Sequence, residues 1–443
     1  MGSRKHMRVG ISRFGAIPLV FILLALLGLP ALAASGDLDS TFDGDGKVIT
    51  IMPHKGWLNQ LAFQTDGKIL AAGFDGSGDV TDFAVNRYNV DGSLDTTFGP
   101  NGTGIVTTDF PGASSDLDFA RSISLQSNGK IVLGGSGGND FGLARYNPDG
   151  TLDTGFGSGG LVTTDFNSGL DVIRAVMLRP ARILVAGYTA TDGVNDWALA
   201  AYRSSGLLDA SFGGGGKVVT DMGGNDQARG AVLVPGGKIV VVGYTKFGQG
   251  VQDFAVARYN SDGTLDTSFG PNGNGKVTTD LGAGDVARAV VLQSDGKIIA
   301  GGYTGSGGGL SRPDGRDVGE FAMVRYDTDG SVDTSFGVGG IVITDMGGAD
   351  HARGIALQSD GKIVLAGNSR VGLDDQFAVA RYYPDGSLDT TFGLDGKVIT
   401  DMGTNGDGAR DVKVQLDGKI LLGGIVSAAG GGFEFAMARY LAT

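Results

Sequence analysis

The 443-residue chain contains no cysteine and only two tryptophans, and basic residues are scarce beside acidic ones, 35 against 48. The absence of cysteine excludes disulfides, thiolate chemistry and metals held by Cys ligands. A net charge of −13 disfavours non-specific binding to nucleic acid or to anionic lipid. Beyond the first 34 residues no segment shows convincing helical periodicity. These absences favour an acidic, all-β protein held together by packing.

Glycine is abundant, with 81 residues, and hydrophobic residues make up 41% of the chain. There is no collagen-like period of three and no long polar tract, so fibrous and disordered classes are excluded. The composition indicates a large apolar core joined by many tight turns.

The first 34 residues have the composition of a secretory signal peptide. Four basic residues precede the apolar run Ala16–Leu29, and the small-residue site Ala31-Leu32-Ala33 follows Pro30. An uncleaved anchor is the alternative, but the run is short for a membrane span and is broken near its end by glycine and proline. We therefore expect residues 1–34 to be removed, the mature protein to be secreted or periplasmic, and no stable membrane insertion to remain.

One phrase, Leu-Asp-x-x-Phe-Gly, recurs with small variations along the chain at intervals of about 56 residues. Its phenylalanines are Phe42, Phe98, Phe156, Phe212, Phe269, Phe336 and Phe392. Each interval contains four short apolar runs separated by turn residues such as Asp360-Gly361 and Asp385-Gly386. Four antiparallel strands per repeat is the pattern of one propeller blade.

The ends of the chain favour a closed ring over an open β-solenoid. Lys47–Thr50 resembles a fourth strand without the three that should precede it, and Phe435–Tyr440 resembles a third strand without a fourth. The N-terminal strand is therefore expected to complete the last blade, which hides both sheet edges. The prediction is one seven-bladed β-propeller over residues 35–443, and we expect a monomer.

The Leu-Asp-x-x-Phe-Gly phrase, the Asp-Gly-Lys turn and the Phe-Ala-x-Ala-Arg-Tyr strand together resemble the delta-60 repeat family of bacterial propeller proteins. The resemblance covers the whole mature chain, and the blade layout is more loosely similar to NHL-type propellers. It implies a propeller in an extracytoplasmic setting, and it supplies no reaction and no catalytic motif.

Aromatic residues recur on every third strand. An aromatic begins the strand and a tyrosine follows five residues later, as in Phe377 and Tyr382. The odd spacing puts the two rings on opposite faces, so each blade should offer one ring to each neighbour. The arginine before the tyrosine, replaced by Ala201 in the third blade, is expected to tie strands together through ion pairs or hydrogen bonds.

A second recurring pattern, Asp-x-x-Arg, opens the first strand of six blades and follows an aspartate that ends the preceding fourth strand. Its arginines are Arg121, Arg174, Arg229, Arg288, Arg353 and Arg410. The first blade has Ile51, Gly56 and Asn59 in the three places, and this joint loss suggests one network of two carboxylates around each guanidinium. The first strand should line the central channel. The network is either a structural ion-pair belt or a site for an anionic ligand at the channel mouth.

Three further residues, His54, His351 and Trp57, are expected in loops on the same face, together with a long loop at residues 310–317. A hydrolase or lyase with a metal-assisted site at the channel mouth is the alternative function. No Ser-His-Asp arrangement or phosphate-binding loop appears. Segments 134–140 and 43–46 each resemble a calcium-binding loop, but each motif occurs once, without the tandem copies that make such motifs specific. The favoured reading is a non-catalytic binding or scaffolding module without a cofactor, whose partner is a protein or a small anion.

Overall fold

The computed structural model describes residues 1–2, 33–78, 80–111, 117–166, 169–248, 250–282, 284–305, 319–403, 406–428 and 430–442. The chain divides into two units, Met1–Ala33 and Ala34–Thr443. Residues 3–32 of the predicted signal peptide and the loop at 310–317 lie outside the described residues. Among the residues that are described, no helix has the length and hydropathy needed to cross a membrane.

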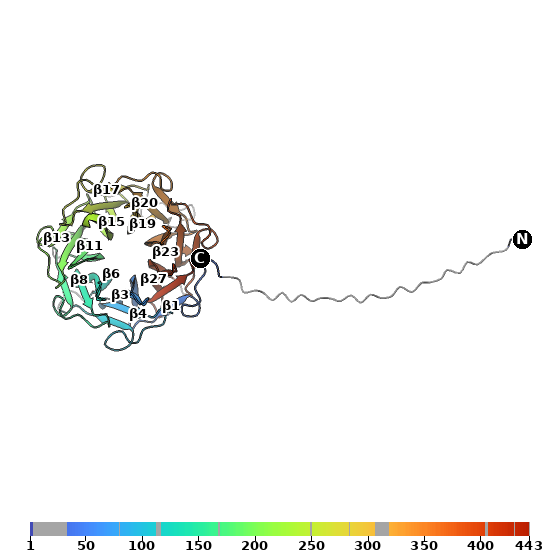
Figure 1. Cartoon of the computed structure of the whole chain (residues 1–443), viewed down its shortest axis with the longest axis horizontal. Helices are drawn as coiled ribbons and strands as arrows, with labels where there is room; N and C mark the ends of the chain where they lie inside the picture. The colour runs from blue at the N-terminus through green and yellow to red at the C-terminus, as the bar shows by residue number, and fades with distance from the viewer. Residues whose placement is uncertain are drawn as a thin grey trace. The chain divides into compact units, whose positions relative to one another are not determined.

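The described part of the second unit forms seven four-stranded antiparallel sheets arranged in a ring (Figure 1). Blade 1 consists of β2 (Gly56–Phe63), β3 (Ile69–Ser77), β4 (Val80–Tyr88) and β5 (Ile105–Thr108). Blade 2 consists of β6 (Phe119–Leu125), β7 (Ile131–Gly137), β8 (Asp140–Tyr146) and β9 (Leu161–Thr164). Blade 3 consists of β10 (Val172–Arg179), β11 (Arg182–Thr191), β12 (Val194–Arg203) and β13 (Lys217–Thr220). Blade 4 consists of β14 (Gln227–Leu233), β15 (Ile239–Lys246), β16 (Gln252–Tyr259) and β17 (Lys276–Thr279), with the 3-10 turn Pro235–Gly237 after β14. Blade 5 consists of β18 (Val286–Leu292), β19 (Ile298–Thr304), β20 (Glu320–Tyr326) and β21 (Ile341–Thr344). Blade 6 consists of β22 (Asp350–Leu357), β23 (Ile363–Val371), β24 (Asp374–Tyr382) and β25 (Lys397–Thr400).

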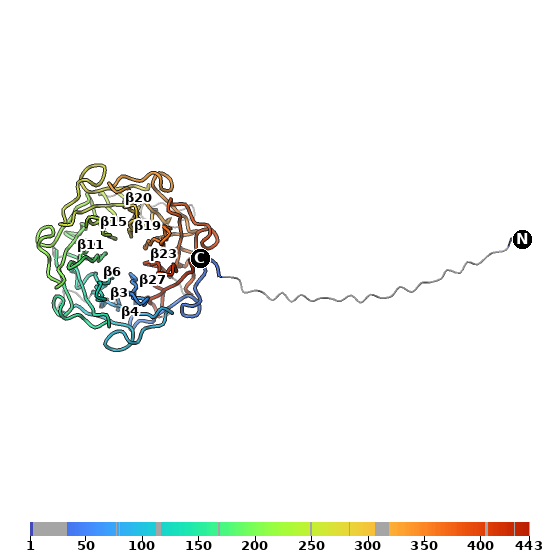
Figure 2. Tube along the Cα trace, in the orientation of Figure 1, coloured from blue at the N-terminus to red at the C-terminus, as the bar shows by residue number. Residues whose placement is uncertain are grey.

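The seventh blade closes the ring with strands from both ends of the propeller. It consists of β26 (Gly408–Val414), β27 (Ile420–Ser427), β28 (Phe433–Tyr440) and β1 (Lys47–Thr50). β1 pairs antiparallel with β28, with Lys47 opposite Ala438 and Thr50 opposite Phe435. The tube in Figure 2 shows the first strand of the ring beside the last. The predicted seven-bladed, all-β propeller with a completing N-terminal strand is confirmed.

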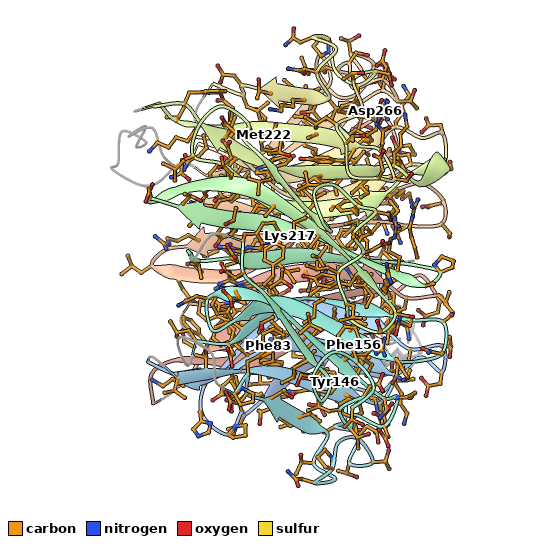
Figure 3. All side chains as sticks on the ribbon, turned by 90° about the vertical axis from the view of Figure 1, so that its left-hand side faces the viewer. Phe83, Tyr146, Phe156, Lys217, Met222 and Asp266 are labelled. Atoms are coloured by element: carbon orange, nitrogen blue, oxygen red, sulfur yellow. The ribbon has the colours of Figure 1, made fainter. Side chains whose placement is uncertain are left out.

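The core lies between blades, as the aromatic spacing predicts. Phe83 of β4 and Tyr146 of β8 belong to one buried cluster, although they come from neighbouring blades (Figure 3). Tyr88, five residues after Phe83, belongs to the cluster on the opposite side of its blade. The buried Tyr146 hydroxyl bonds to Thr108 of the preceding blade at 2.8 Å. Each blade therefore packs one aromatic ring against each of its two neighbours.

In six blades the arginine before the tyrosine joins its blade to the next one. Arg87 Nε donates to Asp95 Oδ2 at 2.7 Å, and Lys68 Nζ reaches the same oxygen at 2.6 Å. Arg87 Nη1 also donates to the carbonyl oxygen of Pro148 in the next blade. The equivalent ion pairs are Arg145–Asp153, Arg258–Asp266, Arg325–Asp333, Arg381–Asp389 and Arg439–Asp39. The predicted tie between strands is confirmed, and it also spans two blades.

Blade 3 keeps this tie with an arginine at a different position. Ala201 cannot pair with Asp209, but Arg182, which stands where the other blades have lysine, contacts Asp209 Oδ2 at 2.5 Å. Arg182 Nη1 also donates to the carbonyl oxygen of Ser261 in the next blade. Two departures from the repeat pattern therefore compensate each other.

Candidate functional site

Each innermost strand contains one β-bulge, and the bulge falls at the same position in every blade. In β6 the pairing shifts between Ala120 and Ser122, which leaves Arg121 without an opposite residue. The residues skipped in this way are Asn59, Arg121, Arg174, Arg229, Arg288, Arg353 and Arg410. A classic bulge turns a side chain away from the regular alternation of the strand. The Asp-x-x-Arg pattern thus marks the bulge, a feature that sequence spacing alone did not reveal.

The seven bulge residues surround one cavity of about 190 Å³ at the centre of the ring. Its remaining lining is uneven around the circle. Blades 1 and 7 contribute Gln60, Asp411 and Lys413, whereas the opposite blades contribute small or apolar residues such as Ala231 and Val290. Lys413 Nζ pairs with Asp411 Oδ2 at 3.0 Å. The structure therefore places all six predicted arginines in the channel, together with one carboxylate that already has a partner.

The arginines do not pair with the aspartates of their own motif. Among the described residues no ion pair joins any of the six guanidinium groups to a carboxylate. Their hydrogen bonds are to neutral groups: Arg121 donates to Asn59 Oδ1 at 3.1 Å, and Arg288 donates to the Tyr303 hydroxyl at 3.0 Å. In all six the Nε atom is inaccessible to solvent and lacks a hydrogen-bond partner in the described structure. The expected network of two carboxylates around each guanidinium is therefore wrong.

The aspartates of the motif instead hold backbone groups. Asp118 Oδ2 accepts from Phe110 N at 2.8 Å, and its Oδ1 accepts from Gly138 N at 2.7 Å. The equivalent aspartates Asp171, Asp226, Asp285, Asp350 and Asp407 each accept from the backbone just after the preceding fourth strand. Where the ring closes, Glu434 supplies this bond to Met52 N at 2.7 Å. The joint absence of aspartate and arginine in blade 1 thus reflects a different connection at the seam.

The channel is strongly electropositive. Burial, together with repulsion from the other channel arginines, lowers the pKa of Arg174 and Arg353 to about 10. The same causes lower the pKa of Arg229 and Arg410 well below its ordinary value. This repulsion between like charges costs free energy in the folded state. Stacking offsets part of this cost, since the Arg410 guanidinium lies 4.4 Å from the centre of the Trp57 ring.

A second pocket of about 330 Å³ adjoins the channel between blades 6, 7 and 1. Arg353 and Arg410 line both cavities, and Trp57, His351 and Phe433 line the second. Trp57 and His351 lie in β2 and β22, so their predicted placement in loops is wrong. Both precede the bulge on a strand that extends further toward the mouth than the sequence indicated.

His54 does lie in a loop, after β1, but it lines neither cavity. Its Nδ1 is 3.0 Å from Asp75 Oδ2, and this contact raises the pKa of the exposed His54 ring. Where the chain is described, clusters of three potential metal ligands contain only aspartates, and no histidine takes part. They are Asp82/Asp109/Asp118, Asp140/Asp165/Asp171, Asp196/Asp221/Asp226 and Asp253/Asp280/Asp285. The structure thus does not assemble the histidine pair that the enzymatic alternative needs.

Burial and the charges of the neighbouring aspartates raise the pKa of the innermost carboxylate in these clusters. The pKa of Asp118 rises to about 6, with Asp109 and Asp82 contributing after burial. The pKa of Asp285 also rises to about 6. The calcium-like segment 134–140 includes the end of β7 and the start of β8, so it is a hairpin.

The chain matches the family model "Domain of unknown function (DUF5122) beta-propeller" in seven segments that together cover more than half of it. The matched residues are 64–98, 126–156, 182–212, 235–269, 293–336, 358–392 and 415–443. The chain belongs to this family. The first six segments each begin near the turn before a second strand and end at the phenylalanine of the recurring phrase, so they follow the blade repeat. Among curated proteins no match was found.

Several solved structures resemble the chain at low sequence identity. A protein of unknown function from Dyadobacter fermentans has 11% identity and a TM-score of 0.48, covering 90% of this chain and 98% of that one. The polysaccharide lyase Uly1 has 10% identity and a TM-score of 0.48, over 89% and 91%. Sqt1 from Chaetomium thermophilum has 12% identity and a TM-score of 0.46, over 88% and 97%. At these values no activity is transferred to this chain.

Proposed function

We propose that this protein is a secreted, non-catalytic propeller that binds an anionic ligand in its central channel. The observation that carries the proposal is that six bulge arginines line one cavity and that their guanidinium groups pair with no carboxylate among the described residues. Like charges brought together in this way repel one another, and the repulsion helps to lower the pKa of Arg353. An anion in the channel offsets this mutual repulsion.

The chemistry of the lining suits binding. Guanidinium groups are charged at neutral pH and are neither nucleophiles nor general bases there. Asp411, the one carboxylate among the lining residues, is held by Lys413 and accepts from Leu61 N at 2.9 Å. These groups fix and neutralise an anion, which is the work of a binding module.

The proposed location rests on the N-terminal sequence, in which basic, apolar and small residues follow one another as in a secretory signal. The resemblance to delta-60 repeat propellers supports the same setting. The ligand would then be met in the periplasm or outside the cell.

Isothermal titration calorimetry at low ionic strength, with a panel of small organic and inorganic anions, tests the binding proposal. Arg288→Ala should weaken the binding of any true ligand about 10-fold or more, since a charge-assisted hydrogen bond contributes about 1.5–3 kcal/mol. Arg203, which is exposed and outside both pockets, provides the matched control Arg203→Ala. Binding that both variants weaken equally, or no binding at all, would overturn the proposal.

A further inference from the structure

We propose that the anion held in the channel is a chain of linked phosphate groups. This inference rests on the proposed function, and it names the chemical class of the ligand. It follows from the number of charges in the cavity, from the cavity's volume and from the way the channel opens at its mouth.

The lining carries a large excess of positive charge. Six arginines and Lys413 face the cavity with a single carboxylate, Asp411, among the lining residues. Because Asp411 is paired with Lys413, the excess belongs to the arginine ring. A monovalent anion would leave most of this charge unbalanced, so the field favours a ligand with several negative charges.

The volume of the cavity then limits the chemistry. About 190 Å³ accommodates only a compact group. A carboxylate contributes one negative charge and needs a carbon skeleton to carry it. In a chain of linked phosphates each end unit carries about 1.5–2 charges and each inner unit about one, and oxygen atoms link the units directly. For equal volume, linked phosphates neutralise more of the ring than a polycarboxylate does. They also offer tetrahedral oxygens on every side, which suits donors that surround the ligand.

The ring is incomplete, and the position of the gap indicates how a chain would extend. Blade 1 contributes the neutral Asn59 in place of an arginine, and Asn59 Oδ1 already accepts from Arg121. On the other side of this gap Arg410 and Arg353 line both the channel and the second pocket. A chain longer than the cavity, or an organic group attached to its end, can leave along these two arginines toward Trp57 and Phe433.

Calorimetry on the full purified chain at matched ionic strength tests the class of ligand with tripolyphosphate, orthophosphate, tricarballylate and a nucleoside triphosphate. Tripolyphosphate should bind about 100-fold more tightly than orthophosphate and about 10-fold more tightly than tricarballylate, because each tenfold step requires only one additional favourable contact of about 1.4 kcal/mol. Arg353→Met should weaken tripolyphosphate binding about 10-fold or more. Arg203→Met is the control, and urea unfolding verifies that both variants are folded.

The outcomes separate the two proposals. Tricarballylate binding as tightly as tripolyphosphate, with the same dependence on Arg353, overturns the phosphate assignment and leaves the anion channel standing. If no anion binds in a way that depends on Arg353 or Arg288, both proposals are overturned. If tripolyphosphate and the nucleoside triphosphate bind equally well, the channel recognises the phosphate chain itself. If only the nucleoside triphosphate binds, the channel recognises a phosphate chain attached to an organic group.

Discussion

The channel arginines should reduce the stability of the ligand-free protein, and replacing one of them should therefore stabilise it. Arg353 is the residue of choice, because its Nε lacks a hydrogen-bond partner in the described structure and burial with repulsion from Arg288 lowers its pKa to about 10. Methionine keeps the length and apolar body of the side chain and removes the charge. Replacing buried charged groups by apolar residues of similar volume is often neutral or stabilising by about 1–4 kcal/mol.

The magnitude can be bounded from the pKa. A pKa lowered from 12.5 to about 10 corresponds to about 3 kcal/mol of unfavourable interaction in the charged form. Arg353 is partly exposed to the channel, and water in the channel screens the repulsion. We therefore expect Arg353→Met to raise the free energy of unfolding by about 1–2 kcal/mol.

Urea denaturation at low salt and again at high salt measures the effect and its origin. The gain should shrink as salt increases, since the Debye length falls from about 30 Å at 0.01 M to about 3 Å at 1 M. Arg203→Met, on the exposed surface, should change stability by less than about 0.5 kcal/mol. If Arg353→Met unfolds at a lower urea concentration than the parent, by an amount that does not change with salt, the Arg353 guanidinium stabilises the folded protein and the reasoning is refuted.

Three further predictions concern the scaffold. Arg182→Ala should lower the free energy of unfolding by about 1–3 kcal/mol, because Asp209 loses its ion-pair partner. Adding Ala201→Arg should restore most of the lost free energy, and urea midpoints that show no such rescue would contradict the compensation. Arg381→Ala should lower the free energy of unfolding by about 1.5–3 kcal/mol, because the buried Asp389 carboxylate loses its guanidinium and keeps only Lys362, at 3.2 Å, as an ion-pair partner; a loss below about 1 kcal/mol would contradict the role of the tie. Stability should be greatest at about pH 4. It rises as pH falls through about 6, because the raised pKa of the innermost aspartates favours their protonated form in the folded state, and it declines below about pH 4, because hydrogen bonds and Arg439 lower the pKa of Asp39 to about 2. Urea midpoints from pH 3 to 8 that fall steadily below pH 7 would contradict this assignment.

The blade was readable from the sequence because it is a local and repeated object. The turns, the alternation of apolar residues and the interval of five between Phe377 and Tyr382 are set by neighbours a few residues away, and seven copies reinforce one another. Closure was also readable, since Lys47–Thr50 and Phe435–Tyr440 are complementary pieces of one sheet. The tie at Arg381 was predicted for the same reason, because its partner Asp389 lies eight residues along the chain.

The partners of Asp118 and Arg121 were not readable in this way. Spacing placed a carboxylate and a guanidinium three residues apart, and opposite charges at that distance suggest a pair. The bulge at Arg121 gives the two side chains different directions: Asp118 turns to the backbone of the neighbouring loop, and Arg121 turns into the channel. A bulge depends on how the innermost strand fits against its neighbours around the whole ring, so it has no local signal in one copy.

The sequence by itself determined the repeated blade, the number of blades and the strand that closes the ring, because local propensity and side-chain alternation specify each unit and repetition specifies their assembly. Only the tertiary structure decided that six arginines, spread over nearly 300 residues of chain, meet in one cavity without carboxylate partners. The physical reason is that the field in the channel is a sum over blades: no single repeat contains it, and it arises only when the ring brings the bulges together.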